Sequence, residues 1–310
     1  MELALFTEPQ FGGTYQNLLD LARWSEEQGL DAFARSDHYL NGSESAPATD
    51  ALTSIAGLAR DTETIELVVL VSPLTFRHPG VLAKTAATID EMSGGRFALG
   101  VGTGWMEGEH DAFGIELYSM RERFSRLFET LSYVRAAFAG TEGFSGRHYT
   151  LAATTDVLPR PTNVRIVIGG SGSQKTPTLA GRFADEYNMG VTDPESLERR
   201  LDVMRRAAAD ADRDPDAIKI SIAGPAIIAD TEQEYRDLLA ERGAKRDLSA
   251  DEYEAFLGER NVPRGTLETA GEAIAAYESL GVSRYYLQEL KALDEVDTDR
   301  LGPVFRALRG

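Results

Sequence analysis

The sequence predicts an α/β protein built as a (β/α)8 barrel, the fold also called a TIM barrel. Strand-like and helix-like segments alternate along the 310 residues, and they form about eight strand–helix units, the number that closes such a barrel. The third strand-like segment, residues 65–71, is almost continuously apolar, which is typical of a parallel strand buried on both faces. A doubly wound open sheet is the alternative, because local alternation does not show whether the sheet closes.

The expected strands are short stretches rich in apolar residues: 2–6, 31–35, 65–71, 96–101, 164–169, 186–189, 219–228 and 284–288. Apolar residues at three- and four-residue spacing predict helices between the first strands. Asp50 is the expected N-cap of the second helix. The predicted inner faces are Leu18, Leu21, Ala22 and Ser25; Leu52, Ile55, Ala56 and Ala59; Leu82, Ala86 and Ile89; and Phe124, Leu127, Phe128, Leu131, Val134 and Phe138.

Two segments break this rhythm within what we expect to be a single barrel domain spanning residues 1–310. Residues 140–164 carry three glycines and two prolines, which predicts an insertion or a small hairpin. Residues 241–265 are charged and weakly periodic. They are interpreted either as a lid over the barrel or as a short helical excursion, although most long loops are only solvated.

Composition narrows the classes of partner. Hydrophobic residues make up 42% of the chain, yet no uncharged apolar run approaches the roughly 20 residues that cross a bilayer. The chain begins with a strand-like segment rather than a leader, so we expect a soluble, cytoplasmic protein. A formal charge of −18 disfavours nucleic acid and anionic membranes as partners. The absence of cysteine excludes disulfides and thiolate ligands, and we expect no metal site.

Active sites of such barrels lie where strands end and the following helices begin. His38 and its neighbour Asp37 follow the second strand, and a histidine there can exchange a proton near neutral pH. A histidine that only hydrogen-bonds its loop is an equally acceptable interpretation. After the third strand, two prolines shape a loop in which Arg77 and His78 are as suited to anchoring the loop as to touching a ligand.

Glycines follow the fourth and fifth strands. Thr103 and Gly104 lie in Gly100-Val101-Gly102-Thr103-Gly104-Trp105, where glycines permit close approach of a planar ligand or simply tight packing. Residues 168–175, Ile-Gly-Gly-Ser-Gly-Ser-Gln-Lys, lead into a helix. Free N–H groups at a helix start suit a phosphate, with Lys175 adding positive charge, so a phosphate site is favoured over a plain turn.

In order along the chain, these stretches resemble the luciferase-like monooxygenase superfamily, and within it the actinobacterial class that uses the deazaflavin coenzyme F420. The matching stretches are Ser36-Asp37-His38, Thr75-Phe76-Arg77-His78-Pro79, Ser93-Gly94-Gly95-Arg96-Phe97, Gly100-Val101-Gly102-Thr103-Gly104-Trp105, Arg147-His148-Tyr149, Ile168-Gly169-Gly170-Ser171-Gly172, Ala184-Asp185-Glu186-Tyr187-Asn188 and Gly265-Thr266. Residues 163–165 and 241–265 depart from the family pattern, so the resemblance does not carry a substrate identity.

The resemblance implies a barrel that holds a flavin-like ring over its mouth. Asp37 and His38 would lie beside the ring as the catalytic residues, with His38 exchanging a proton. The other implied coenzyme residues are Leu70, Val71 and Ser72, with a non-proline cis peptide among them; Thr103 and Gly104; and Gly169, Gly170, Ser171, Gly172 and Lys175 for the phosphate. A homodimer is common in the superfamily and is the expected assembly.

Three functions follow from these observations. The first is an oxidoreductase that transfers a hydride between F420 and a small to medium organic substrate. The second is an FMN-dependent monooxygenase with the same fold, and the third is a non-catalytic flavin-binding relative. The expected substrate pocket is partly apolar and is formed by Phe6, Tyr39, Trp105, Met106 and Glu107.

Overall fold

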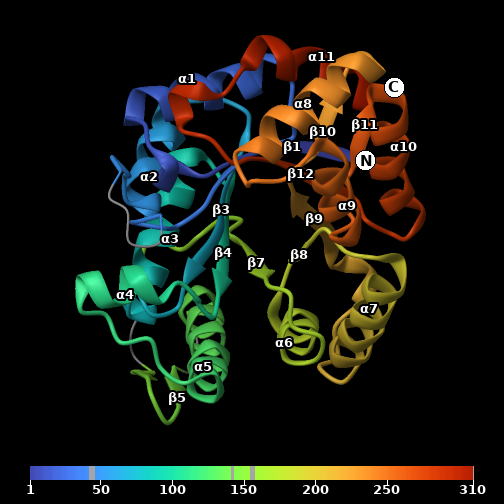
Figure 1. Ribbon diagram of the computed structural model, residues 1–310. Coiled ribbons are helices and arrows are strands. Elements are labelled where there is room, and N and C mark those ends of the chain that lie inside the picture. Colours follow the sequence, from blue (N-terminus) through green and yellow to red (C-terminus); the bar gives the residue numbers. More distant parts are fainter. Residues whose placement is uncertain (42–45, 141–142, 154–157, 310) are drawn as a thin grey trace.

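The computed structural model describes residues 1–41, 46–140, 143–153 and 158–309 (Figure 1). Within these residues, eight parallel strands form a closed barrel in the order β1, β12, β9, β8, β7, β4, β3, β2. This closure confirms the predicted (β/α)8 barrel and excludes the open sheet. The strands are β1 (Glu2–Thr7), β2 (Ala32–Arg35), β3 (Glu66–Pro73), β4 (Phe97–Gly102), β7 (Arg165–Gly169), β8 (Glu186–Gly190), β9 (Lys219–Gly224) and β12 (Arg284–Glu289).

Helices connect and surround the strands (Figure 1). They are α1 (Tyr15–Glu27), α2 (Ala51–Asp61), α3 (Pro79–Ser93), α4 (Glu107–Phe113), α5 (Met120–Ala139), α6 (Lys175–Phe183), α7 (Pro194–Ala209), α8 (Glu232–Ala244), α9 (Ala250–Glu259), α10 (Leu267–Ser279) and α11 (Thr298–Leu308), with 3-10 turns at Pro9–Phe11, Pro215–Ala217 and Leu293–Glu295. The predicted N-cap is confirmed, because the Asp50 carboxylate accepts a 2.8 Å hydrogen bond from the Thr53 N–H. In the described ranges, no helix has the length and apolar character needed to cross a membrane.

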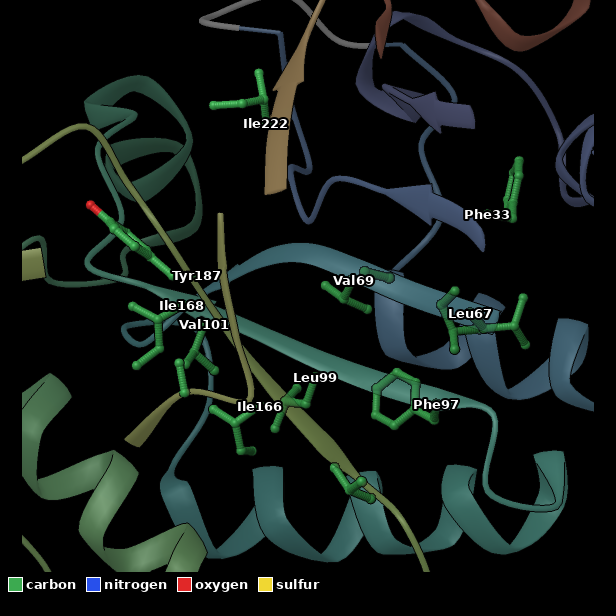
Figure 2. Close-up of a cluster of buried hydrophobic side chains, with 14 of the residues drawn as sticks. Phe33, Leu67, Val69, Phe97, Leu99, Val101, Ile166, Ile168, Tyr187 and Ile222 are labelled. Carbon is green, nitrogen blue, oxygen red and sulfur yellow. The ribbon is translucent and has the colours of Figure 1, made fainter. Parts of the chain in front are cut away.

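Strand side chains alternate between two cores. Large side chains on the outer face, such as Phe33, Leu67 and Phe97, pack in the main cluster between strands and helices (Figure 2). The inner face is built mainly from smaller residues, and its cluster is Ala4, Phe6, Ala32, Ala34, Val68, Leu70, Ala98, Val167 and Tyr286. Because the side chains fill the barrel interior, a ligand can approach only at an end.

A buried ionic network fills the amino-terminal end of the barrel. The Arg284 side chain on β12 is fully enclosed and donates to Glu2 on β1 (2.7 Å), Glu66 on β3 (2.8 Å) and Glu186 on β8 (3.1 Å). The hydroxyl of Tyr286 donates to the same Glu186 at 2.9 Å. Burial, and then the charge of Glu186, hold the pKa of Tyr286 well above its ordinary value. One guanidinium thus joins four strands and leaves the opposite end of the barrel as the mouth.

The prediction of one strand over residues 219–228 is wrong. β9 ends at Gly224, and Ile227–Ala229 forms β10, which pairs in parallel with β11 (Arg264–Thr266) in a separate small sheet. Pro225 lies between the two strands, and proline has no N–H to continue a ladder.

The two irregular segments contain regular structure of their own. In the segment 140–164, β5 (Phe144–Ser145) and β6 (Thr150–Leu151) pair antiparallel, while residues 141–142 and 154–157 lie outside the described residues. The segment 241–265 holds the end of α8, then α9 and most of β11. These elements enclose a small apolar cluster that includes Tyr235, Leu239 and Leu257. A lid function for this segment stays a prediction.

We expect Arg284→Met to destabilise the fold strongly, because it leaves three carboxylates at the end of the barrel without their shared cation. Removing one partner of a buried ion pair costs about 3–5 kcal/mol. Chemical denaturation should show a loss of that size, whereas Arg205→Met, on the exposed face of α7, should change the free energy of unfolding by less than about 0.5 kcal/mol. Equal losses in the two variants would show that the network does not hold the barrel.

Candidate active site

The imidazole of His38 is held by a buried carboxylate. Its Nδ1 lies 2.9 Å from Glu109 Oε1, and the other oxygen of Glu109 accepts from the backbone N–H of Tyr39 at 3.0 Å. Glu109 is enclosed in the first turn of α4, while His38 stays partly exposed beyond β2. Burial alone lowers the pKa of His38, but the hydrogen bond and charge of Glu109, followed by the charges of Glu8 and Asp37, raise it above 6.5 overall. In the described residues, no hydrogen bond engages Nε2.

Asp37 is fully buried, and two neighbouring side chains bond to its carboxylate. The Ser72 hydroxyl donates to it at 2.7 Å, and the guanidinium of Arg77 forms an ion pair with it. Arg77 also pairs with Asp50 and donates to the hydroxyl of Tyr39 at 3.2 Å. Burial lowers the pKa of Arg77, but the charge and hydrogen bond of Asp37, together with the charges of Asp50 and Tyr39, outweigh it and raise the pKa above its ordinary range. Arg77 therefore fastens the ends of β2 and β3 to the start of α2.

The strand β3 bulges where the resemblance places the ring. The peptide bond between Leu70 and Val71 is cis, as the resemblance implies, and the register with β4 shifts between Val69 and Ser72. The Val71 side chain enters a space that neighbouring glycines leave open. A Cβ atom at Gly100, Gly102 or Gly169 would lie 2.8 Å from a Val71 methyl group. These glycines thus make room for a protein side chain, which favours the packing interpretation for Gly100 and Gly102.

The segment after β4 carries several predicted contacts. Gly104 has a φ of +76°, which side chains rarely adopt, and its carbonyl accepts from Arg123. Trp105 is 67% exposed and meets the His38 ring edge-on at 5.6 Å between centroids. Thr103 is partly exposed. This segment therefore places an exposed indole beside the imidazole.

The remaining predicted pocket residues differ in their surroundings. Phe6 is buried in the inner barrel cluster, Met106 is buried, and Glu107 is exposed at the start of α4. Tyr39 stacks on Phe76 at 4.6 Å and contacts the Arg77 network through its hydroxyl. Their contact with a substrate stays a prediction.

The glycine loop lies open to solvent at the end of β7. Gly170, Ser171 and Gly172 are exposed, and Gln174, the N-cap of α6, makes no side-chain cap. The first N–H groups of α6 therefore face outward without a side-chain partner at the cap. Lys175 is also exposed, but its ammonium lies 5.0 Å above the Phe124 ring, where it lines a cavity of about 340 Å³ with Arg121 and Arg182.

The barrel order brings these predicted residues together. Residues 37–38 follow β2, residues 70–72 end β3, residues 103–104 follow β4, and residues 169–172 follow β7. These four strands are consecutive neighbours in the barrel. The predicted coenzyme residues therefore occupy one half of the mouth, although they are spread over more than a hundred positions of sequence.

The sequence analysis missed the partners of the two predicted catalytic residues. The sequence pattern does not single out Glu109, and it leaves Arg77 open between anchoring its loop and touching a ligand. Both follow neighbouring strands of the barrel, β4 and β3, close to where β2 delivers Asp37 and His38. Charged residues that follow adjacent strands of a barrel lie close together, and this placement was the signal in the sequence that could have identified Glu109 and Arg77 as partners.

Comparison with known proteins shows the family. The model of the luciferase-like monooxygenase family matches residues 1–284, which is most of the chain. The chain belongs to the luciferase-like monooxygenase family. Among solved structures, this luciferase-like chain is similar to monooxygenase RslO1 from Streptomyces bottropensis, with a TM-score of 0.81, 23% identity and coverage of 99% of this chain and 97% of that one. At this identity the likeness supports the fold.

Curated relatives use two coenzymes. An F420-dependent glucose-6-phosphate dehydrogenase of Microbacterium testaceum is 37% identical over 62% of this chain and 57% of its own length. An FMNH(2)-dependent dimethylsulfone monooxygenase of Pseudomonas putida is 29% identical over 74% of this chain and 63% of its own length. The chain thus spans little more than half the length of the first curated relatives it matches.

We expect Glu109→Gln to lower the pKa of His38, because it removes the charge and the acceptor that stabilise the imidazolium. An NMR titration of the His38 ring protons should show the imidazolium losing its proton at lower pH than in the native chain. Asp111→Asn, on the exposed side of the same helix, is the matched control and should leave the titration unchanged. A titration of Glu109→Gln that follows the native curve would contradict the assignment of Glu109.

Proposed function

We propose that this chain is an oxidoreductase that transfers a hydride between coenzyme F420 and a small to medium organic substrate. The observation that carries the proposal is the His38–Glu109 pair at the mouth of the barrel, 2.9 Å apart and beside the residues predicted to bind the coenzyme. A partly exposed imidazole with a raised pKa, whose Nε2 makes no hydrogen bond to the described residues, suits proton exchange near neutral pH.

The residues after β7 fit a phosphate-bearing coenzyme. The loop carries only glycine and serine between Gly169 and Ser173, and a Cβ at Gly172 would meet the Thr176 hydroxyl at 2.8 Å. The following helix begins without a side-chain cap, so its first N–H groups are available to an anion. Gly170, Ser171, Gly172 and Lys175 would hold the phosphate in this proposal.

The residues on β3 and β4 would position the ring. Leu70, Val71 and Ser72 form the bulge at the mouth, and Thr103 and Gly104 directly follow the neighbouring strand β4. When bound, F420 supplies a carbon centre that carries or accepts the hydride. The protein then has to orient the substrate over that centre and to manage the proton.

His38 would manage that proton through Nε2. The buried Glu109 carboxylate fixes Nδ1 and so orients the ring, and it stabilises the positive charge that appears when Nε2 gains a proton. Asp37 would act on His38 only through its charge, because its carboxylate is already bonded to Arg77 and Ser72. In the direction of substrate reduction Nε2 donates the proton, and in oxidation it accepts one.

An FMN-dependent monooxygenase is the second candidate. The Pseudomonas putida relative with FMNH(2) in its name aligns with a larger share of this chain than the Microbacterium testaceum relative, at lower identity. We favour F420 because the higher identity is to the F420-dependent relatives.

The proposal also includes the assembly and the location of the protein. We propose a homodimer in the cytoplasm that acts on a small-molecule substrate.

A binding titration tests the coenzyme directly. We expect the purified chain to quench the fluorescence of F420 on binding, with weaker or no quenching of FMN, because the proposal places a deazaflavin at the mouth. A Gly172→Val variant should weaken coenzyme binding by crowding Thr176, with Gly271→Val, which lies on α10 away from the mouth, as the control. Preferential binding of FMN would overturn the F420 assignment and favour the monooxygenase.

Replacement of His38 separates catalysis from binding. We expect His38→Asn to lower turnover about 10²- to 10⁴-fold, the usual contribution of a general acid or base, while F420 affinity stays within a few-fold. His148→Asn, in the hairpin segment, is the control because its ring contacts Ser125 rather than the mouth. Unchanged turnover in His38→Asn would remove His38 from the mechanism. A native chain that binds coenzyme without turning over any substrate would instead favour a non-catalytic flavin-binding relative.

A further inference from the structure

A second cavity lies in the other half of the barrel mouth. It has a volume of about 360 Å³ and lies between the residues that follow β9, the end of β12 and the end of α8. Its lining residues are Pro225, Ala226, Arg242, Lys245, Arg246, Tyr253, Gln288, Glu289, Leu290 and Lys291. The segment 241–265 therefore contributes part of the wall, through Arg242, Lys245, Arg246 and Tyr253.

Cations dominate the polar lining of this cavity. Lys245 is paired with Glu241 at 2.9 Å, and Arg246 lies 5.6 Å from the Phe256 ring centroid. Arg242 and Lys291 are each only partly exposed, and within the described residues neither makes a hydrogen bond or ion pair. On a chain with a formal charge of −18, two half-buried cations without an anionic partner leave a local excess of positive charge.

Glu289 is the carboxyl group within the lining, against four basic side chains. Burial raises its pKa, the charges of Arg242, Lys291 and Arg300 oppose the rise, and the net shift is upward. Arg300 is engaged elsewhere, since it donates to the carbonyl of Ile228 at 2.6 Å. Outside the lining, Glu241 interacts with Arg242 and Lys291 through its charge but is paired with Lys245, so the lining itself keeps an excess of basic groups.

A hydrogen bond links the wall of this cavity to a carboxylate that acts on His38, and the predicted coenzyme residues do not line the cavity. Gln288, in its wall, donates to the buried Glu8 carboxylate, whose charge acts on His38. In the barrel, β9 and β12 lie across from β3 and β4, where the ring is expected. A molecule that reached from this cavity toward His38 would approach from the side opposite the glycine loop.

We propose that Arg242 and Lys291 bind an anionic group of the substrate, a phosphate or a carboxylate, and so orient its reacting end toward His38. This inference rests on the proposed function for the identity of the reaction, but the anion site itself does not. Charge-assisted hydrogen bonds from a guanidinium and an ammonium are the usual way in which proteins hold such groups.

Inorganic phosphate is the probe for the site. Calorimetric titration of the coenzyme-free chain at low ionic strength should show phosphate binding, and Arg242→Gln/Lys291→Gln should weaken it at least about tenfold. Arg199→Gln/Arg205→Gln, on the exposed face of α7, changes the net charge equally and should bind phosphate as the native chain does. Unchanged binding in the first variant, or an equal loss in the control, would overturn the proposal.

A competition distinguishes the substrate from the coenzyme as the source of the anion. If the cavity serves the substrate, saturation with F420 leaves in place the phosphate binding that depends on Arg242 and Lys291, and the Arg242→Gln/Lys291→Gln variant keeps the native affinity for F420. Loss of that Arg242- and Lys291-dependent binding on saturation with F420, or a tenfold loss of F420 affinity in the variant, would show that the cations hold the coenzyme and would overturn the proposal. A native chain that binds phosphate but not F420 would instead refute the proposed coenzyme while leaving the anion site intact.

Discussion

The buried ion pair between Asp37 and Arg77 constrains the rest of the active site. A carboxylate that is fully enclosed must be neutralised where it lies, because an unpaired charge in that position would cost several kcal/mol. Arg77 meets this requirement only if the loop after β3 folds back over the end of β2, and its second pair with Asp50 draws in the start of α2. The position of His38, one residue beyond Asp37, follows from that arrangement.

The barrel separates the molecule into a structural end and a chemical end. At the amino-terminal end, Arg284 donates hydrogen bonds to carboxylates from three strands. Mainly small side chains fill the barrel interior between this network and the mouth. At the mouth, Gly100, Gly102 and Gly169 have no side chains, which leaves room for Val71 to pack against the inner cluster. A bulky residue thus closes the barrel beneath the expected ring, and a ligand can lie across the mouth without entering the core.

The features of the fold and of the site that depend on local pattern could be predicted from the sequence. Strand-helix alternation predicts the barrel, and position after a strand selects His38, Asp37 and the glycine loop. It could not predict contacts that require the barrel to close: Glu109 reaches His38 from 71 residues away, and Val71 explains glycines on two other strands. For residues 241–265 the sequence left two interpretations open for a different reason, because helices that pack mainly against each other carry only a weak amphipathic pattern.

The two carboxylates beside His38 have different tasks because their partners differ. Asp37 is already bonded to Arg77 and Ser72, so its charge acts on the imidazole less strongly than the charge of Glu109 does. Glu109 has the Tyr39 N–H and His38 as its hydrogen-bond partners, so its charge is directed at the ring. Among the contributions that raise the pKa of His38 against burial, the hydrogen bond and charge of Glu109 are the largest. Because Arg77 pairs with Asp37 and Asp50, the charge of Glu109 remains available to stabilise the protonated form of His38.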